Sequence, residues 1–438
     1  MVQAAVSSRL VLSEHRWLRF LTLALFYVAQ GVPAGVTIIA IPAWAAANGA
    51  SDEAVASLVA AAYAVPSFKF LIGPVVDRYV YIPMGRRRPW LIGAQVLMTL
   101  GWLGAAIIAP GPHDTALLIA VTFLVSGTTA VQDVAADGLA TDILEERETG
   151  SAGAFTFGSA VISMAATGGL AGYLFQNFGS QATFLATLPL IAVVTILAIL
   201  VLERPGERRL PWSNGEASEQ AQATRAQAWL PLAVAVFRQV ITRDSLIFIA
   251  IILATGLGAG MITPLLPIYG TAIVGLDTAG FATLQSSIAV PTAAISMVVL
   301  AALAPRLGLR LTLVVILALD GALVLLWAID PLVLTAFAAF AGYLVIYGTL
   351  SAFRQMAMQG MRMALSETRV GATQMTVYNS LGNLPLSLGA GLFALLGGSG
   401  ALTIVLGTAG ALLVVGAVLT LLLRIGRREP RPVSIPQS

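Results

Sequence analysis

A small number of ionisable side chains lie inside long apolar stretches of the sequence, where they could bind a solute or carry a proton. Lys69 is the single lysine of the chain and lies between two phenylalanines. Asp133 and Asp137 are four residues apart, so they share one face of a helix. An ionisable group at the centre of a membrane span costs about 2.5–3.5 kcal/mol on insertion scales, and it usually marks a functional site. We expect Lys69 and Asp133 to be coupled, as a structural ion pair, as part of such a site, or as both.

Asp137 and Arg354 each allow more than one interpretation. Asp137 either shares the site of Asp133 or joins the arginines at positions 86–88. Arg354 either binds a carboxylate or phosphate bidentately, or snorkels, or pairs with Asp133 across the site. Asp320 is expected only to make a helix-packing hydrogen bond or to be protonated. The candidate residues for substrate binding or proton coupling are Tyr27, Gln30, Lys69, Gln132, Asp133, Asp137, Arg354 and Gln355, and Tyr343, Tyr347, Tyr378, Asn379 and Asn383 could also line the site.

The composition places these residues in a membrane. Of the 438 residues, 58% are hydrophobic and 10% are charged, with a mean hydropathy of +0.88, whereas a soluble protein is roughly 25% charged. Cysteine is absent, which excludes disulfides and thiolate metal sites. The two histidines lie beside predicted loops and no phosphate-loop motif is present, so we expect no metal, no other cofactor and no direct use of ATP. The expected partners are a small-molecule solute, protons and the lipid bilayer, and not nucleic acid.

A helix needs about 20 mostly apolar residues to cross a bilayer, and twelve such windows can be placed. The first is too long for a signal peptide, so we expect it to be the first span. The predicted fold class is an all-α integral membrane protein with twelve transmembrane helices. The windows are residues 18–44, 54–76, 90–110, 115–140, 152–176, 181–202, 245–271, 278–303, 311–329, 331–360, 371–397 and 400–424.

The basic residues are segregated to one side of these spans. Both ends of the chain and every second loop, starting with the loop between spans 2 and 3, carry arginines. The alternate loops carry only Asp52, Glu53, Asp114, Asp277 and Asp330. By the positive-inside rule, we expect both termini and the long central loop to be cytoplasmic.

The windows divide the chain into two six-helix bundles. The first is residues 1–202 and the second is residues 245–424, with a cytoplasmic linker at 203–244 and a cytoplasmic tail at 425–438. The first part of the linker, ERPGERRLPWSNGEASEQ, is expected to be flexible. Its second part, RAQAWLPLAVAVFRQVITR, is either an interfacial helix on the inner leaflet or a solvated linker. We expect a monomer.

The two bundles look like repeats of each other. GVPAGVTIIAIP in span 1 and GLGAGMITPLLP in span 7 share the spacing of two glycines and a proline. Residues 129–147 align without gaps to residues 351–369, which matches Gln132 to Arg354 and Asp133 to Gln355. This six-plus-six parallel repeat resembles the plan of the major facilitator transporters, in which the substrate site lies between the halves near mid-membrane.

The segment after span 2, DRYVYIPMGRRR, resembles the cytoplasmic signature that major facilitator proteins carry between spans 2 and 3. An acidic helix end, a glycine turn and arginines could form a charge cluster that locks the cytoplasmic side in one state. The alternative is that the arginines only set the topology. The candidate gating residues are Asp77, Arg78, Gly85, Arg86, Arg87, Arg88, Glu145, Arg147, Glu367 and Arg369.

FKFLIGPVVDRY, GRRRPWL and QDVAADGLATDIL are similar to motifs of the AmpG-like permease and acetyl-CoA transporter family, over roughly residues 20–155. The resemblance implies a secondary transporter of a bacterial inner membrane that imports a mid-sized organic solute by alternating access. Since no phosphate-loop motif is present, such a carrier would use a proton gradient or facilitated exchange, and Asp133 in its apolar span favours protons. A muropeptide is the first expectation, because it carries ammonium and carboxylate groups. A siderophore is the alternative, since the enterobacterial muropeptide permeases are expected to have further C-terminal spans. An integral-membrane transferase is disfavoured by the short loops, so no enzyme activity is expected.

Overall fold

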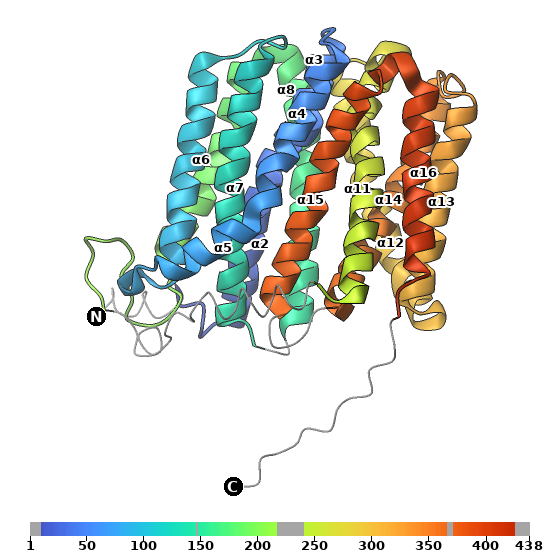
Figure 1. Ribbon diagram of the computed structural model, residues 1–438. Helices are drawn as coiled ribbons and strands as arrows, with labels where there is room; N and C mark the ends of the chain where they lie inside the picture. The colour runs from blue at the N-terminus through green and yellow to red at the C-terminus, as the bar shows by residue number, and fades with distance from the viewer. Residues whose placement is uncertain (1–9, 146–147, 217–240, 366–370, 425–438) are drawn as a thin grey trace, which may run out of the picture.

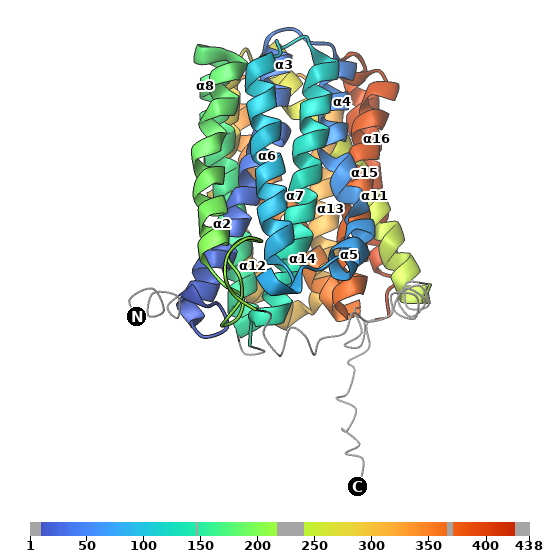
Figure 2. The same cartoon turned by 90° about the vertical axis from the view of Figure 1, so that its left-hand side faces the viewer.

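The computed structural model describes residues 10–145, 148–216, 241–365 and 371–424, and this part of the chain is almost wholly helical (Figure 1 and Figure 2). Among the described residues, ten helices are long and apolar enough to cross a membrane. The expected all-α membrane class is confirmed. The helices are α2 (Arg16–Ala34), α3 (Ile41–Ala47), α4 (Asp52–Ala64), α5 (Lys69–Arg78), α6 (Arg88–Ile108), α7 (Thr115–Ile143), α8 (Thr149–Leu200), α11 (Arg243–Ile268), α12 (Thr278–Leu307), α13 (Leu309–Ile329), α14 (Phe337–Leu365), α15 (Gly371–Leu395) and α16 (Leu402–Thr420).

Two differences explain why there are ten candidate spans and not the twelve predicted windows. α8 is 52 residues long and is interrupted at Gly179, whose φ of 76° and ψ of −174° are not helical, so windows 152–176 and 181–202 lie on either side of this residue. α15 occupies window 371–397 but is not among the ten spans. Window 331–360 also begins too early, because residues 331–334 form a turn and α14 begins at Phe337. The count of twelve crossings therefore stays a prediction.

The second span bends near its middle, and the bend positions Lys69. A 3₁₀ turn, Val65–Phe68, separates α4 from α5. Pro66 in this turn has no backbone N–H to continue the α-helix, and the Ser67 hydroxyl donates to the Tyr63 carbonyl oxygen at 2.7 Å. Lys69 therefore starts a new helix inside the span.

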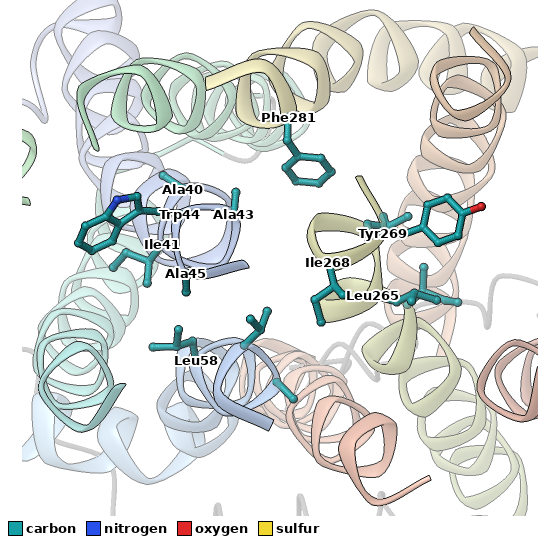
Figure 3. Close-up of a cluster of buried hydrophobic side chains, with 14 of the residues drawn as sticks. Ala40, Ile41, Ala43, Trp44, Ala45, Leu58, Leu265, Ile268, Tyr269 and Phe281 are labelled. Atoms are coloured by element: carbon teal, nitrogen blue, oxygen red, sulfur yellow. The ribbon is translucent and has the colours of Figure 1, made fainter. Parts of the chain in front are cut away.

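The apolar core is continuous between the two halves of the molecule at one end only. Figure 3 shows the shared core, in which Trp44 and Leu58 of the first half lie with Tyr269 and Phe281 of the second half. At the opposite end there are two separate cores, one drawn from the first half alone and one from the second half alone. The halves also meet along α8 with α12 and along α4 with α15. In this conformation the two halves share one apolar core at one end and have separate apolar cores at the other.

The two ends also differ in charge. We call the end with the shared core the acidic end, after Asp52, Asp277 and Asp330, and the other the arginine-rich end, after Arg19, Arg87 and Arg88. At the acidic end, polar bonds reinforce the shared core. The Asp52 carboxylate accepts a hydrogen bond from the Ser399 N–H. The Gln176 side chain donates to Asp277 at 2.8 Å and accepts from the Ala279 N–H at 2.7 Å, which closes a second contact between the halves.

Glycines that the two sequence repeats share make close helix contacts in both halves. A Cβ at Gly35 of the first span would lie 2.5 Å from the Met164 carbonyl oxygen of α8. A Cβ at Gly260 of α11 would lie 2.4 Å from the Leu386 carbonyl oxygen of α15. The backbones therefore touch directly at both crossings, as small residues allow in membrane helices.

Gly260→Ala should destabilise the protein by about 1–3 kcal/mol, because the added methyl group meets backbone and not a flexible side chain. The measurement is the midpoint of thermal unfolding in detergent. Gly104→Ala is the matched control, since nothing lies within 4 Å of a Cβ at that position of α6. Equal midpoints for the two variants would contradict the close packing of α11 on α15.

Candidate functional site

Three helices of the first half bring four polar side chains together inside the membrane. Lys69 of α5 forms an ion pair with Asp133 of α7, and the two side chains are only 21% and 14% exposed. The Tyr27 hydroxyl of α2 donates a hydrogen bond to Asp137, which lies one turn along α7. Asp137 is also within electrostatic range of Lys69. We call these four residues the first-half cluster, and the expected Lys69–Asp133 pair is present in it.

The first-half cluster contains one cation and two carboxylates. With both carboxylates ionised, its net charge is −1, which is unfavourable inside an apolar span. The Tyr27 phenol stabilises Asp137 by a hydrogen bond but brings no compensating charge. The excess carboxylate is therefore suited either to take up a proton or to hold a cationic group of a solute.

Gln132 lies apart from the first-half cluster, contrary to expectation. Its side chain is fully buried, accepts a hydrogen bond from Gln95 at 2.9 Å and donates one to the Phe26 carbonyl oxygen at 2.9 Å. Successive helix residues point about 100° apart, so Gln132 ties α7 to α6 and α2 while Asp133 faces α5. The side-chain nitrogen of Gln30 is buried and has no hydrogen-bond partner among the described residues, so Gln30 keeps its place as a candidate.

The second half contains a buried ion pair of its own. Arg354 of α14 pairs with Asp320 of α13, and their side chains are 8% and 0% exposed. Arg354 also donates to the Ser351 hydroxyl at 3.0 Å. The alternatives of snorkelling and of pairing with Asp133 are therefore wrong for Arg354 in this structure. Gln355, which follows Arg354 in the chain and corresponds to Asp133 in the repeat, is exposed on α14.

At the arginine-rich end, Arg87 joins the end of the second span to α7. Its guanidinium donates to Asp77 at 2.5 Å and to Asp142 at 3.1 Å, and Arg86 approaches Asp142 at 3.9 Å. Burial alone would lower the pKa of Arg87, but the two carboxylates raise it overall. The carboxylate of α7 that meets these arginines is Asp142, so the alternative that Asp137 joins them is wrong.

Glu203, just after α8, holds the arginine segment in its shape. Its carboxylate accepts the backbone N–H groups of Arg86, Arg87 and Arg88 at 3.0, 2.7 and 2.7 Å. Gly85 has a φ of 95°, and a Cβ there would lie 2.5 Å from the Glu203 carboxyl carbon, so the turn requires glycine on both counts. Burial raises the pKa of Glu203, although the hydrogen bonds from the three N–H groups act to lower it.

The start of the linker is folded against the first half and is not a flexible tether, which corrects the expectation for its first part. Glu207 is buried, and its carboxylate accepts the Glu203 N–H at 3.0 Å. Burial raises the pKa of Glu207 to about 7. The fully buried guanidinium of Arg88 donates to the backbone carbonyl oxygens of Met84, Ala198, Ile199, Arg208 and Arg209. The possible interfacial helix lies largely in residues 217–240, outside the described part.

Arg19 and Glu148 form a buried ion pair at the arginine-rich end, and the charge pattern of the sequence does not mark either residue. The pair is 2.8 Å long, and hydrogen bonds from Arg19 lower the pKa of Glu148. Glu145 reaches Arg19 at 3.4 Å and not the arginines after span 2. Arg78 is exposed and makes no ion pair with a described carboxylate. The remaining gating candidates, Arg147, Glu367 and Arg369, lie outside the described residues.

Known proteins resemble this chain in sequence. A family model described as Major Facilitator Superfamily matches residues 20–390. The anhydromuropeptide permease of Escherichia coli (strain K12) is 28% identical over 179 residues, which are 40% of this chain and 36% of that protein. An uncharacterized membrane protein of Saccharomyces cerevisiae is 30% identical over 159 residues, which are 31% of this chain and 28% of that protein. The chain thus matches about a third of the length of these relatives.

One solved structure is similar over nearly the whole chain. It is described as a POT family transporter in complex with a thioalcohol conjugated peptide, and it superposes with a TM-score of 0.67. The match covers 93% of this chain and 96% of that one at 12% identity. At such low identity the likeness concerns the fold alone.

Lys69→Met should destabilise the protein by about 3–5 kcal/mol at neutral pH, because it leaves Asp133 buried without its cation. The double variant Lys69→Met with Asp133→Asn should recover part of this loss, because Asp133 then carries no charge, while Asp137 keeps its hydrogen bond from the Tyr27 hydroxyl. Thermal unfolding in detergent measures both. A double variant that is as unstable as the single one would contradict the pairing.

Glu207 should make the protein less stable as the pH rises. Burial raises its folded-state pKa to about 7, from the ordinary glutamate value of 4.5. The folded state therefore binds the proton more tightly than the unfolded state, and stability falls as the pH rises from about 4.5 through about 7. Glu207→Gln should remove this part of the dependence, whereas Glu216→Gln, at an exposed glutamate, should not. The test compares thermal unfolding midpoints at about pH 5 and about pH 8. Identical pH profiles for wild type and Glu207→Gln would show that Glu207 does not cause this pH dependence.

Proposed function

Because the chain belongs to the Major Facilitator Superfamily, we propose that it is a proton-coupled permease for an anhydromuropeptide. The chain is a membrane transporter of the permease kind and not an enzyme. The observation that carries the choice of solute is the 28% identity to an anhydromuropeptide permease. An anhydro-muramyl peptide has ammonium and carboxylate groups, which suit carboxylates and cations buried in both halves.

The proposed architecture is twelve membrane crossings in two six-helix repeats. α8 supplies two crossings, separated at Gly179, and α15 supplies one. The first bundle is residues 1–202, the linker 203–244, the second bundle 245–424 and the tail 425–438. The arginine-rich end, with both termini, faces the cytoplasm of a bacterial inner membrane, in agreement with the positive-inside rule. The working unit is a monomer.

The conformation is proposed to be open towards the cytoplasm. Two features support this: the apolar core is shared between the halves only at the acidic end, and each half has its own core at the arginine-rich end. Arg87 accordingly pairs with Asp77 and Asp142, both of the first half. Asp77 and Arg86–Arg88 act as a latch that changes partners when the cytoplasmic side closes.

Asp133 is the proposed proton carrier. It shares Lys69 with Asp137, so the cluster is one positive charge short when both carboxylates are ionised. A proton loaded from the outer side removes this excess, and Lys69 or a solute ammonium competes for the carboxylate when the site reopens inside. The matching repeat position, Gln355, does not titrate, so the coupling is asymmetric between the halves.

Proteoliposomes should accumulate anhydromuropeptide when an inward proton gradient is imposed, and a protonophore should abolish the accumulation. Asp133→Asn should keep solute exchange and lose gradient-driven accumulation, because an amide takes up no proton. Asp330→Asn, at an exposed loop of the acidic end, is the matched control and should accumulate like wild type.

Two results would count against the proposal separately. If Asp133→Asn still concentrates the solute in response to the gradient, Asp133 is not the proton carrier. If the wild type transports a ferric siderophore and no anhydromuropeptide, the proposed solute is wrong, but the proposed role of Asp133 as proton carrier is unaffected.

A further inference from the structure

Unused hydrogen-bonding capacity surrounds the ion pair of the second half. One oxygen of Asp320 pairs with Arg354, but its Oδ1 is buried and has no hydrogen-bond partner among the described residues. The Tyr343 hydroxyl is buried and unpartnered in the same part of the structure, and it lies within electrostatic range of Asp320. Leaving buried polar atoms without partners is unfavourable. A proton on Oδ1 would turn this oxygen into a hydrogen-bond donor, for which the Tyr343 hydroxyl is a neutral acceptor in the same part of the structure.

Few other charges face Asp320. Tyr343 and Tyr347 of α14 stack with their ring centroids 5.7 Å apart, and Tyr347 lies within electrostatic range of Arg354 and of Tyr63 on α4. α12 and α16 are the other helices that pack on α13, and the only titratable residue in their sequences is Arg306, near the last residue of α12. Within the described part, Arg354 is thus the charge that neutralises Asp320.

We propose that Arg354 binds an anionic group of the transported solute and that Asp320 occupies Arg354 until a proton arrives. A carboxylate or phosphate of the solute replaces Asp320 at the guanidinium, and Asp320 takes up one proton. One anion and one proton reach Arg354 and Asp320 together, so the net charge of this buried site is unchanged. This inference depends on the proposed function in that the chain carries a solute, and it adds a second proton-linked site and the requirement for an anionic solute.

Protonation is what makes the exchange possible. Removing one partner from a buried ion pair leaves an uncompensated charge, which is strongly unfavourable. Among the described residues, Arg354 is the one cation paired with Asp320, whereas a protonated Asp320 needs only a neutral acceptor such as the Tyr343 hydroxyl. A guanidinium is in turn well suited to a carboxylate or phosphate, because its planar fork matches both.

The first arm of the test needs no solute. Phenylglyoxal, which attacks accessible arginines, is applied to wild type, Asp320→Asn and Ser351→Ala, and modification of Arg354 is followed by peptide mass spectrometry. We expect modification to be several-fold faster in Asp320→Asn, and acetate to slow it as a competing anion. Ser351→Ala, which removes only a neutral hydrogen bond, should behave like wild type. Asp320→Ser takes the place of Asp320→Asn if that variant does not fold.

The second arm measures binding of anhydromuropeptide by calorimetry across pH. Uptake of one proton makes the affinity rise about tenfold for each unit of pH decrease while Asp320 is charged in the free protein. Asp320→Asn should take up one proton fewer per bound solute than wild type and should bind more tightly at neutral pH, because its guanidinium is already released.

The two arms separate this inference from the proposed function. If wild type binds no anhydromuropeptide, the solute of the proposed function is wrong, and the phenylglyoxal arm alone decides on Asp320. If Arg354 reacts equally fast in wild type and Asp320→Asn, or if acetate gives no protection, the proposal is overturned whatever the solute is. Equal proton uptake by wild type and Asp320→Asn on solute binding would overturn it as well.

Discussion

An ionised side chain inside an apolar span is costly unless the protein supplies a partner of opposite charge, and each half of this chain contains one such ion pair. Lys69 meets Asp133 in the first half, and Arg354 meets Asp320 in the second. No described ion pair in the span region joins the halves, so they can move relative to each other without separating buried charges. The same constraint makes the pairs sensitive to protons and to charged solutes, because any new charge must replace an old partner.

The remaining structure fits this division into two self-contained halves. Apolar packing and the contacts of Asp52 and Gln176 join them at the acidic end, and each keeps a separate core at the arginine-rich end. The first half is further stiffened where Glu203 and Arg88 fasten the arginine segment to the chain after α8. Motion between the halves therefore has to open the acidic end, which is held by apolar packing and a few hydrogen bonds. The arginine-rich end of the first half moves as one rigid unit.

The sequence predicts some of these features well and others poorly, for physical reasons. Long apolar windows and the segregation of arginines predict membrane helices directly, and Lys69 and Asp133 were expected to pair because few other charges lie in the spans. The sequence does not predict the Arg354–Asp320 pair, because the repeat alignment of residues 129–147 with 351–369 gives no information about Asp320. Asp142 and Glu203 were missed because an acidic residue at a helix end looks like ordinary solvated surface, and its backbone partners leave no pattern in sequence. Gln132 and Asp133 are neighbours in sequence, and the turn of the helix sends them to different faces.

On the proposed mechanism, proton occupancy of the first-half cluster determines how the two halves are placed relative to each other. Because the chain has no native cysteine, one spin label can be placed in each half at the arginine-rich end, through Tyr79→Cys and Leu421→Cys at exposed positions. Electron–electron double resonance then measures the distance between the labels in lipid nanodiscs. We expect a lower pH to shift this distance distribution in the wild type, and we expect Asp133→Asn to remove the shift. An equal shift in Asp133→Asn, or a wild-type distribution that does not change with pH, would rule out this role for the first-half cluster.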